Sequence, residues 1–452
     1  MPGKILVKST SGIRGVIGRG LDPVLVAKYG AAFGTMLKKG KVVVGRDSRP
    51  SGDMIMKAVI SGLLASGRDV VEIGIVPTPT VEIAVKTLKA AGGMCITASH
   101  NPSQWNALKF FNRKGEFIIP AEYKRLDKLF SSGKFQYQPY SKLGKLVCQS
   151  DWVEKHIGKT LAVKVVNVPA VRRHRFKVVV DAINGAGSVA LPKLLRRMGA
   201  TVFEVNCNND GKFVHEPEPT PANLSQLARA VRRHKADLGM ACDPDADRLA
   251  LVDEKGRPIG EELTLTIAVM EVLKKRRGTT VINMSTSRAT ADVARAAGSK
   301  VIYSKVGEAN VVQAMHRAKA IIGGEGNGGV IYPSFHAGRD ALIGAALVLS
   351  CLAEEKMSLS GLVETLPTYF TIKSKASFPA DFKTRLAKFE KGAAELLGSC
   401  RVDRRDGLRF DFTEGWAQVR SSNTEPIFRL IVETDDTKLT ARLTRQILRY
   451  FK

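Results

Sequence analysis

The sequence predicts an α/β protein in which three similar α/β domains with mixed sheets precede a smaller C-terminal α+β domain. Three segments, at 41–44, 177–180 and 280–283, begin alike. Each is rich in β-forming residues and is followed by a polar turn and a helix-compatible stretch. Strands that alternate with helices form mainly parallel or mixed sheets. The segments start roughly 100 to 140 residues apart, too far for a solenoid repeat but suitable for repeated domains.

The C-terminal part of the chain follows a different pattern. Beyond Pro367, a strand-like run at 370–374 is followed by a helical run at 388–397. A β-rich run at 419–432 and a terminal amphipathic segment complete this part, which we expect to form the α+β domain. A chain of 452 residues is too long for one hydrophobic core, so two to four domains are expected. The expected domains are 1–150, 151–255, 256–370 and 371–452.

The composition, 44% hydrophobic and 25% charged residues, is that of an ordinary globular protein. The six cysteines lie far apart, form no Cys-x-x-Cys pair and follow no export signal, so we expect free thiols in a reducing cytoplasm. The longest nearly apolar stretch, 341–353, is shorter than the ~20 residues that a membrane helix needs. We therefore expect a cytoplasmic protein without a membrane partner.

The formal net charge of +27 raises the question of nucleic acid binding. The basic residues are dispersed in short runs, no recognition motif accompanies them, and aromatic residues make up only 6% of the chain. A solvated basic surface is the favoured interpretation, with weak, salt-sensitive attraction to polyanions as a by-product. Such a field would also favour anionic substrates.

The most informative motif places three carboxylates at alternate positions, Asp243, Asp245 and Asp247. Anions about 4 Å apart repel by roughly 4 kcal/mol per pair at an effective dielectric near 20, so the cluster predicts a bound cation. Oxygen ligands favour a hard ion such as Mg²⁺. The flanking runs at 238–242 and 249–252 are apolar and compatible with strands. The aspartates are therefore expected in a loop that leaves a strand.

An EF-hand and a solvated acidic turn are the alternatives for the aspartate loop. In an EF-hand, Glu254 would fall at the twelfth loop position, but Arg248 occupies the sixth, where glycine is required. Pro244 and the flanking strands also argue against a helix-loop-helix unit. A solvated acidic turn is the second alternative, and the motif alone leaves it open.

A second motif, Thr97-Ala98-Ser99-His100-Asn101-Pro102, can expose the hydroxyl of Ser99. It lacks the Gly-x-Ser-x-Gly setting of a hydrolase, and His100 is the immediate neighbour, so a Ser-His-Asp triad is not supported. Alone, Ser99 would be a turn or N-cap serine. Beside the aspartates, a phosphate-carrying serine would need a divalent ion during transfer. Lys109 could assist that charge or relay a proton, or could simply be solvated.

Two further loops have compositions suited to ligands. The run 323–329 has five glycines around Glu325 and Asn327, so backbone could approach a ligand while the two side chains face hydroxyls. It matches neither the dinucleotide fingerprint nor a Walker motif, and a flexible turn is the alternative. The run 420–426, with Arg429 beyond it, combines guanidiniums, hydroxyls and turn amides that could hold phosphate. An ion-paired turn competes with this interpretation.

Together, these motifs resemble those of the α-D-phosphohexomutases, the family of phosphoglucomutase, phosphomannomutase and phosphoglucosamine mutase. The motifs Thr-Ser-Gly-Ile-Arg-Gly at 10–15 and Gly-Arg-Asp-Ser-Arg at 45–49 precede the four loops in the family order. The resemblance covers nearly the full chain. It implies four domains around a central cleft, with one of the four loops contributed by each domain.

The resemblance also implies residue roles on the catalytic side. Ser99 would carry the phosphate, and Mg²⁺ would bind this phosphate together with the three aspartates. Arg14 and Lys109 would flank the transferring phosphoryl group, and Arg248 would lie near the substrate. The implied reaction interconverts hexose 6-phosphate and hexose 1-phosphate through a bisphosphorylated sugar, which would also act as activator.

On the substrate side, the resemblance implies that Glu325 and Asn327 orient sugar hydroxyls. It also implies that the C-terminal loop binds the phosphate group that is not being transferred. The residues of this phosphate site would be Arg420, Ser422, Asn423, Thr424 and Arg429.

The chain departs from the usual family pattern at three places. Asn327 stands where many members have serine, Ala107 where glycine is usual, and Ala309 where a basic residue is common. The asparagine form is similar to the archaeal-type phosphoglucosamine mutase branch, so glucosamine phosphate is the expected substrate, with a broad phosphomannomutase/phosphoglucomutase as the alternative. More distant alternatives are a Mg²⁺-dependent sugar phosphatase and a nucleic-acid-binding protein. The oligomeric state stays open, a homo-oligomer included.

Overall fold

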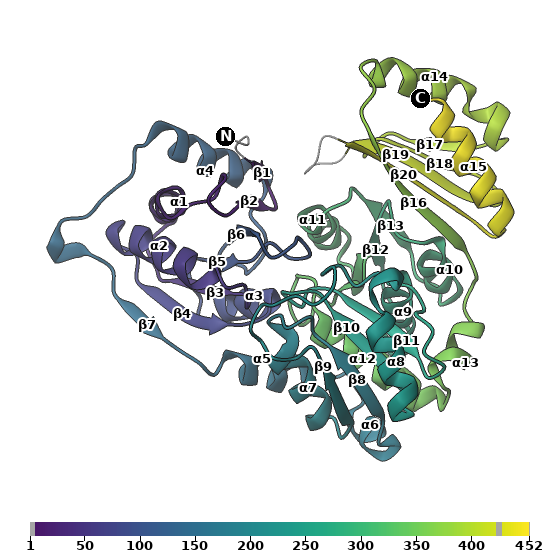
Figure 1. The fold of residues 1–452 in the computed structure, drawn as a ribbon, viewed down its shortest axis with the longest axis horizontal. Coiled ribbons are helices and arrows are strands. Elements are labelled where there is room, and N and C mark those ends of the chain that lie inside the picture. Colours follow the sequence, from purple (N-terminus) through teal and green to yellow (C-terminus); the bar gives the residue numbers. More distant parts are fainter. Residues whose placement is uncertain (1–4, 422–426, 452) are drawn as a thin grey trace.

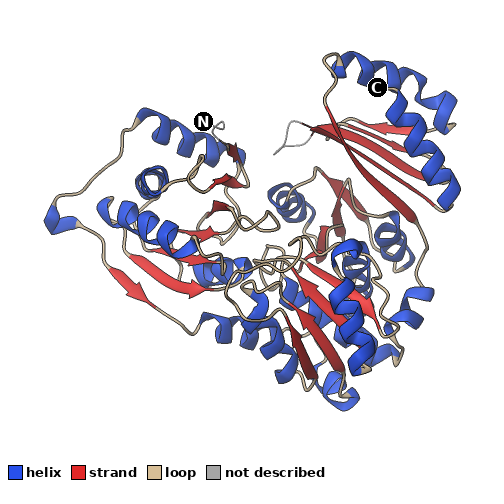
Figure 2. Cartoon of the chain, in the orientation of Figure 1, coloured by secondary structure: helices blue, strands red, loops and turns tan. Residues whose placement is uncertain are grey.

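The structure is a computed structural model that describes residues 5–421 and 427–451. It contains four sheets, which follow one another along the chain from the purple N-terminal part to the yellow C-terminal part of Figure 1. Three sheets are mixed and carry helices, and the last is antiparallel. The predicted fold class is confirmed. Figure 2 shows loops gathering where the first three sheets meet, at the centre of the view.

The first sheet has seven strands in the order β1-β2-β6-β5-β3-β4-β7. Strand β3 pairs in parallel with β4 and β5, whereas β6 is antiparallel to β5. The strands are β1 (Leu6–Ser9), β2 (Gly12–Val16), β3 (Val42–Arg46), β4 (Val70–Ile75), β5 (Gly92–Ile96), β6 (Trp105–Phe111) and β7 (Leu146–Cys148). The helices are α1 (Pro23–Met36), α2 (Gly52–Ala65), α3 (Thr78–Thr87), α4 (Pro120–Ser132) and the short η1 (Tyr140–Lys142).

The second sheet has the order β11-β10-β8-β9, and only β10 and β11 pair antiparallel. Its strands are β8 (Lys177–Asp181), β9 (Thr201–Val205), β10 (Leu238–Cys242) and β11 (Leu249–Asp253). The helices are α5 (Trp152–Leu161), α6 (Val168–His174), α7 (Gly187–Arg197), η2 (Pro221–Asn223) and α8 (Ser225–His234).

The third sheet repeats this topology in the order β13-β12-β14-β15, again with one antiparallel pair, β14 and β15. Its strands are β12 (Thr280–Asn283), β13 (Val301–Ser304), β14 (Ile322–Glu325) and β15 (Gly329–Ile331). The helices are α9 (Glu262–Lys275), α10 (Arg288–Ala296), α11 (Glu308–Ala318), α12 (Ala341–Glu355) and α13 (Leu359–Glu364).

The shared topology places three predicted loops at equivalent positions. In each unit a central parallel strand is followed by an antiparallel one: β5 by β6, β10 by β11, and β14 by β15. The Ser99 loop, the aspartate loop and the Glu325 turn are the three connections. Ligand sites in open α/β sheets lie beyond the carboxyl ends of the parallel strands, as these loops do.

The fourth sheet is fully antiparallel, in the order β16-β20-β19-β18-β17. Its strands are β16 (Phe370–Ser377), β17 (Arg401–Asp403), β18 (Leu408–Asp411), β19 (Gly415–Ser421) and β20 (Ile427–Thr434). Helices α14 (Phe382–Leu397) and α15 (Thr437–Arg449) cover one face (Figure 1). The β-rich run at 419–432 thus belongs to two strands, and the helix expected at 388–397 begins six residues earlier, at Phe382.

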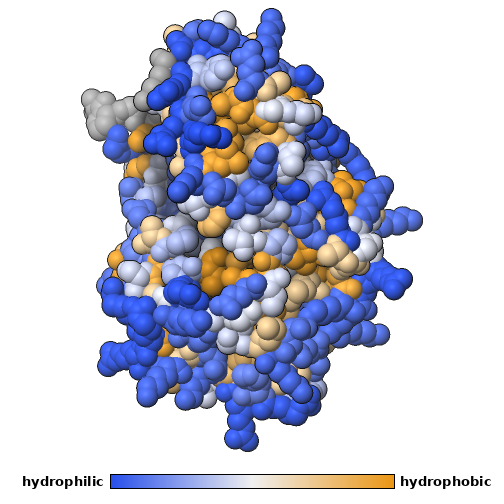
Figure 3. All heavy atoms as spheres, turned by 90° about the vertical axis from the view of Figure 1, so that its right-hand side faces the viewer, coloured by the Kyte–Doolittle hydropathy of each residue, from blue (hydrophilic) through white to orange (hydrophobic). Residues whose placement is uncertain are grey.

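Two hydrophobic cores extend across units. The second and third sheets share one continuous core, to which the nearly apolar helix α12 contributes most of its residues, and one core of the first unit includes Trp152 of α5. The other cores lie within single units. Among the helices that the structure describes, none has the length and apolarity to cross a membrane. On the face drawn in Figure 3, hydrophilic side chains predominate and apolar ones form separate patches.

Candidate active site

Ser99 lies in the loop after β5, and its side chain faces the second domain. Its hydroxyl donates to Asp243 Oδ2 at 2.8 Å, and its backbone N–H donates to Thr97 Oγ1. The residue is only 3% exposed. Its φ of +49° lies in the left-handed region, which is unfavourable for a residue with a side chain and persists only where the surroundings impose it. The loop therefore aims this hydroxyl at the aspartates.

The surroundings that impose this conformation centre on Arg49, which is fully buried. Its Nη2 donates to the carbonyl oxygens of Ser99 and Asn101, and its Nη1 donates to those of Pro102 and Trp105. Its Nε forms an ion pair with Asp47. The sequence marked Arg49 only as part of a motif; its role in holding the Ser99 loop depends on contacts about 50 residues away and has no local signal.

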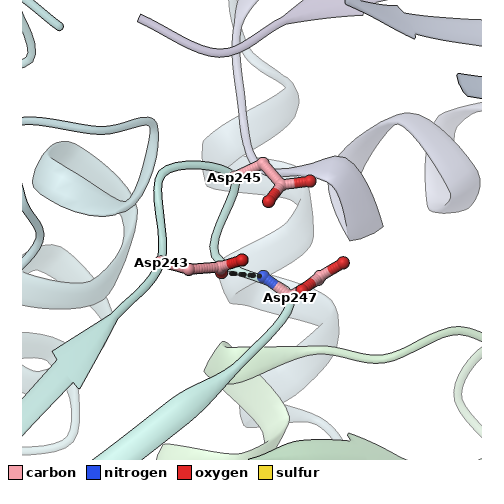
Figure 4. Close-up of side chains that lie close together, drawn as sticks. All are labelled: Asp243, Asp245 and Asp247. Carbon is pink, nitrogen blue, oxygen red and sulfur yellow. Dashed lines mark hydrogen bonds between the residues drawn. The ribbon is translucent and has the colours of Figure 1, made fainter. Parts of the chain in front are cut away.

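The three aspartates occupy the turn between β10 and β11 and are fully buried (Figure 4). One carboxylate oxygen from each lies within 4.8 Å of the others. Asp243 Oδ1 accepts from the backbone N–H of Asp247. Asp245 Oδ1 and Asp247 Oδ1 have no hydrogen-bond partner. Buried carboxylate oxygens are costly without a partner, so this donor set fits a hard divalent cation.

The electrostatics of the aspartates agree with this interpretation. Burial and the charges of Asp247 and Asp245 raise the pKa of Asp243 well above its ordinary value. Burial also opposes ionisation of Asp247, but Arg339, Lys109 and Arg248 outweigh it and lower the pKa of Asp247. The protein's own cations thus do not stabilise all three carboxylates in their ionised form, and a bound cation would do so.

Lys109 and Arg14 lie on the strands beside Ser99. Lys109 Nζ donates to Asp245 Oδ2 at 2.5 Å and to Asp247 Oδ2 at 3.2 Å. Burial lowers the pKa of Lys109, but Asp245 and Asp247 raise it by more, so the ammonium remains charged. Arg14 donates to Asn101 in the Ser99 loop, and burial together with Arg248 lowers its pKa to about 10. Both side chains are cations at neutral pH.

Arg339 is a site residue that the sequence analysis missed. This buried guanidinium donates from Nη2 to Asp247 at 2.7 Å, from Nη1 to Glu325 at 2.9 Å and from Nε to Glu308 at 3.0 Å. It therefore ties the aspartate loop to the Glu325 turn. The signal was weak because Arg339 belongs to no charged run and its partners lie 14 to 92 residues away.

The candidate substrate residues surround this connection. Glu325 is 3% exposed, and its Oε1 accepts from Asn283 Nδ2 and from the backbone N–H of Gly307, both at 2.8 Å. Asn327 is half-buried, and its Oδ1 accepts from the backbone N–H of Gly329. Arg248 donates from Nη1 to Glu218, while its Nε lies 3.7 Å from Asp247. These side chains are held in place by protein partners.

The fourth predicted loop is partly described. Arg420 on β19 and Arg429 on β20 are directly opposite in the antiparallel pairing, so their side chains lie on one face. Burial lowers the pKa of Arg420, with Arg429 contributing. Two neighbouring guanidiniums on a strand pair favour an anionic ligand between them. Ser422, Asn423 and Thr424 lie outside the described residues.

A buried serine lies against a carboxylate cluster, with cations on either side and two arginines on a separate domain, an arrangement that suits phosphoryl transfer. Four family models match consecutive parts of the chain: phosphoglucomutase/phosphomannomutase domain I at 6–137, domain II at 154–256, domain III at 260–370 and the C-terminal domain at 372–449. The chain belongs to the phosphoglucomutase/phosphomannomutase family and is a phosphohexomutase.

Individual relatives agree over nearly their full lengths. A phosphoglucomutase/phosphomannomutase of Thermococcus kodakarensis is 39% identical, with 94% of this chain and 93% of the relative covered. A probable phosphoglucosamine mutase of Pyrococcus abyssi is 37% identical with the same coverage. Among solved structures, a phosphoglucomutase/phosphomannomutase family protein from Burkholderia thailandensis superposes with a TM-score of 0.86 at 28% identity, covering 98% of this chain and 97% of that one.

Proposed function

We propose that this phosphohexomutase prefers glucosamine phosphate and that Ser99 is its phosphoryl carrier. The role of Ser99 as carrier is supported by the 2.8 Å hydrogen bond from Ser99 Oγ to Asp243 Oδ2, which brings the serine to the aspartate cluster. The substrate preference is supported by the asparagine at position 327 and by the relatives named phosphoglucosamine mutase. Glucose and mannose phosphates are the alternative, which the Thermococcus relative's name favours.

In the proposed reaction, a hydroxyl of the sugar phosphate takes the phosphoryl group from Ser99. A new bond forms between the sugar oxygen and phosphorus while the bond to Ser99 Oγ breaks, and the proton of the sugar hydroxyl ends on the serine. The bisphosphorylated sugar then turns round and returns its other phosphoryl group to Ser99. Lys109 and Arg14 stabilise the charge that spreads over the phosphoryl oxygens. Because Lys109 stays charged, its contribution is electrostatic.

Mg²⁺ is the proposed cofactor, held by Asp243, Asp245, Asp247 and the phosphate of Ser99. When bound, it would supply positive charge to the phosphoryl group during transfer. The two unpartnered carboxylate oxygens support this assignment. A bisphosphorylated hexose is the proposed activator, since it would load Ser99 with phosphate.

For substrate binding, we propose that Arg248, Glu325 and Asn327 contact the sugar. The phosphate that is not transferred would be held on the C-terminal domain. The proposed residues of this phosphate site are Arg420, Ser422, Asn423, Thr424 and Arg429. A phosphate site on a separate domain explains how the enzyme can bind the bisphosphorylated sugar in two orientations. Either phosphate can occupy this site while the other faces Ser99.

The proposed domain limits are 1–150, 151–255, 256–370 and 371–452. A cytoplasmic location is supported by the free state of all six cysteines. Sugar phosphates are the proposed partners, with no membrane and no specific nucleic acid among them. A homo-oligomer is compatible with all these proposals.

The decisive experiment compares Ser99→Ala with Ser131→Ala, an exposed serine on α4. We expect Ser99→Ala to lose mutase turnover and the ability to acquire label from a ³²P-labelled bisphosphorylated hexose, with its melting temperature retained. Ser131→Ala should behave as the unchanged protein. Labelling or full turnover in Ser99→Ala would refute the carrier. Values of kcat/KM for the 1-phosphates of glucosamine, glucose and mannose test the substrate.

A further inference from the structure

A cavity of about 810 Å³ lies away from the aspartates, where the first three domains meet. The first domain contributes the C-terminal end of α3, the second contributes α5 and the residues after it, and the third contributes residues 332–336 together with Arg276. We call it the seam cavity. Its volume falls within the range of roughly 300 to 1,000 Å³ that is typical of small-molecule sites.

The charged lining of the seam cavity is entirely basic. Its exposed members are Lys86, Lys159, Lys164 and Arg276, the buried His336 also lines the cavity, and among the residues that the structure describes no aspartate or glutamate does so. Arg276 is oriented by two hydrogen bonds from Nη1, to the hydroxyls of Tyr332 at 3.0 Å and Ser334 at 2.9 Å. Lys86 reaches across the seam towards the carbonyl oxygen of Phe335. All four side chains are exposed, so solvent screens their mutual repulsion, but together they give the cavity a positive potential that favours an anion.

The remaining lining is apolar and aromatic. Ile83, Val163 and Val165 form part of it, and the half-buried ring of Phe335 and the buried ring of Tyr332 line the third-domain side. Phe335 is supported by the ring of His336 at a centroid distance of 5.1 Å. An inorganic anion alone would make no contact with these apolar surfaces. A ligand with an anionic end and a planar, less polar end would contact both the basic and the apolar parts of the lining.

Two walls of the seam cavity continue to the active site. Helix α3 begins at Thr78, whose N–H and hydroxyl both donate to Asp245, and Lys86 in its last turn lines the cavity about 12 Å further on, at 1.5 Å per residue. Residues 332–336 are followed by Arg339, which binds Asp247 and Glu325. An occupant would thus contact two segments that position active-site residues.

We propose that the seam cavity binds a small phosphorylated ligand with a planar ring, of the nucleoside diphosphate class. Its phosphates lie among Lys86, Lys159, Lys164 and Arg276, and its ring packs against Phe335. This site is separate from the aspartate cluster and from the arginines of the fourth domain.

Isothermal titration calorimetry of the full-length protein with ADP, inorganic pyrophosphate and adenosine tests the proposal. We expect ADP to bind at one site per chain, pyrophosphate to bind more weakly, and adenosine not to bind up to about 1 mM. In Lys159→Glu/Lys164→Glu, affinity for ADP should fall at least ~10-fold, because two charge-assisted contacts are lost. Arg276→Gln should weaken binding independently of that double variant.

The matched control is Lys383→Glu/Lys388→Glu, which makes the same charge change at exposed positions of α14. It should leave the affinity for ADP within about twofold, because distant surface charges are screened. Arg420→Ala should also leave ADP binding intact. Absence of ADP binding, equal affinity in the cavity variants and the control, or loss of binding in Arg420→Ala would each overturn the site. Equal affinities for pyrophosphate and ADP would overturn the nucleotide class.

Discussion

Arg339 is the residue at which the aspartate loop, the Glu325 turn and Glu308 meet. Its three carboxylate partners are themselves buried, and Arg339 raises the ionised fraction of Asp247 by favouring its charged form. Burial of several like charges is tolerated only when such a partner is present. At the scale of residues, the site is therefore a balance of buried charges in which single substitutions have large effects.

Arg339→Met should lower the free energy of unfolding by about 3–5 kcal/mol, because it leaves buried carboxylates without a partner. Arg339→Lys keeps the charge but cannot span three carboxylates, so kcat should fall even where most stability is kept. Urea unfolding and mutase kinetics measure both effects. Arg317→Met, at an exposed position of α11, should change stability by no more than about 0.5 kcal/mol. A fully active Arg339→Met protein would refute this positioning role.

Asp243→Asn separates metal binding from folding. In the metal-free protein the raised pKa of Asp243 shows that its ionised form is disfavoured, and asparagine can still accept the backbone hydrogen bonds from Asp247 and Arg248. We expect the melting temperature of the variant in EDTA to equal or exceed that of the parent protein. The increase in melting temperature on adding Mg²⁺ should disappear, and turnover should fall at least ~100-fold. A preserved Mg²⁺ response would contradict the proposed ligand set.

The element scale is dominated by one repeated unit, a parallel strand followed by a turn and an antiparallel strand. The unit occurs in the first three domains and places Ser99, the aspartates and Glu325 at the same structural position. The turns differ in how they are fixed. The Ser99 loop depends on Arg49, whereas the aspartate turn is held by neighbouring domains through Thr78 and through the N–H of Ala341, which donates to the carbonyl oxygen of Ala246.

Arg49→Lys tests whether the Ser99 loop needs this support. Lysine keeps the charge but has three donors on one nitrogen and cannot reach four carbonyl oxygens and Asp47 together. We expect kcat to fall by at least ~10-fold and stability to fall by about 2–3 kcal/mol. Arg46→Lys is the control, since within the described part of the chain the side chain of Arg46 makes one hydrogen bond, to the backbone carbonyl oxygen of Asp47. Similar kinetics for the two variants would show that the loop holds its shape without Arg49.

At the scale of the whole molecule, a buried network joins the first three domains. His336 lies 3.3 Å from Glu82 on α3 and 3.1 Å from Asp340, which also contacts His156 on α5. Burial lowers the pKa of His336, but Asp340 and Glu82 raise it by more, to about 9. Burial and Glu308 raise the pKa of Glu82 to about 8. Domain association thus depends on protonation at the centre of the molecule.

This network predicts a loss of stability at alkaline pH. Since the pKa of His336 is higher in the folded state, its stabilisation is complete below pH 6.5 and is lost as the pH rises through 9. The raised pKa of buried Glu82 acts in the same direction, because its part of the loss accumulates from pH 4.5 and is complete near pH 8. We expect a loss of roughly 2–3 kcal/mol between pH 7 and 9.5, measured by urea unfolding. His336→Gln should flatten this profile, and an unchanged profile would exclude the network as its cause.

The sequence by itself determined those features of the protein that depend on residues close together in the chain. Asp243, Asp245 and Asp247 are close in the chain, so their chemistry could be predicted from one turn and the two strands beside it. The alternation of strands and helices likewise predicted the fold class, because periodicity and turn residues act over short distances. The element bounds of the C-terminal part were predicted less accurately. Helix α14 begins at Phe382 rather than at residue 388, and the run at 419–432 belongs to two strands.

Only the tertiary structure decided which distant residues complete the site. Thr78 and Arg339 have no distinctive neighbours in the sequence, and Arg49 was marked only as part of a motif, yet each acts on groups 14 to 167 residues away. The reason is physical: a buried charge is stable only beside its partners, and the packing of domains, which a local pattern does not encode, brings those partners together. The sequence by itself thus determined the chemical groups, and the assembled domains decided their charge balance and geometry.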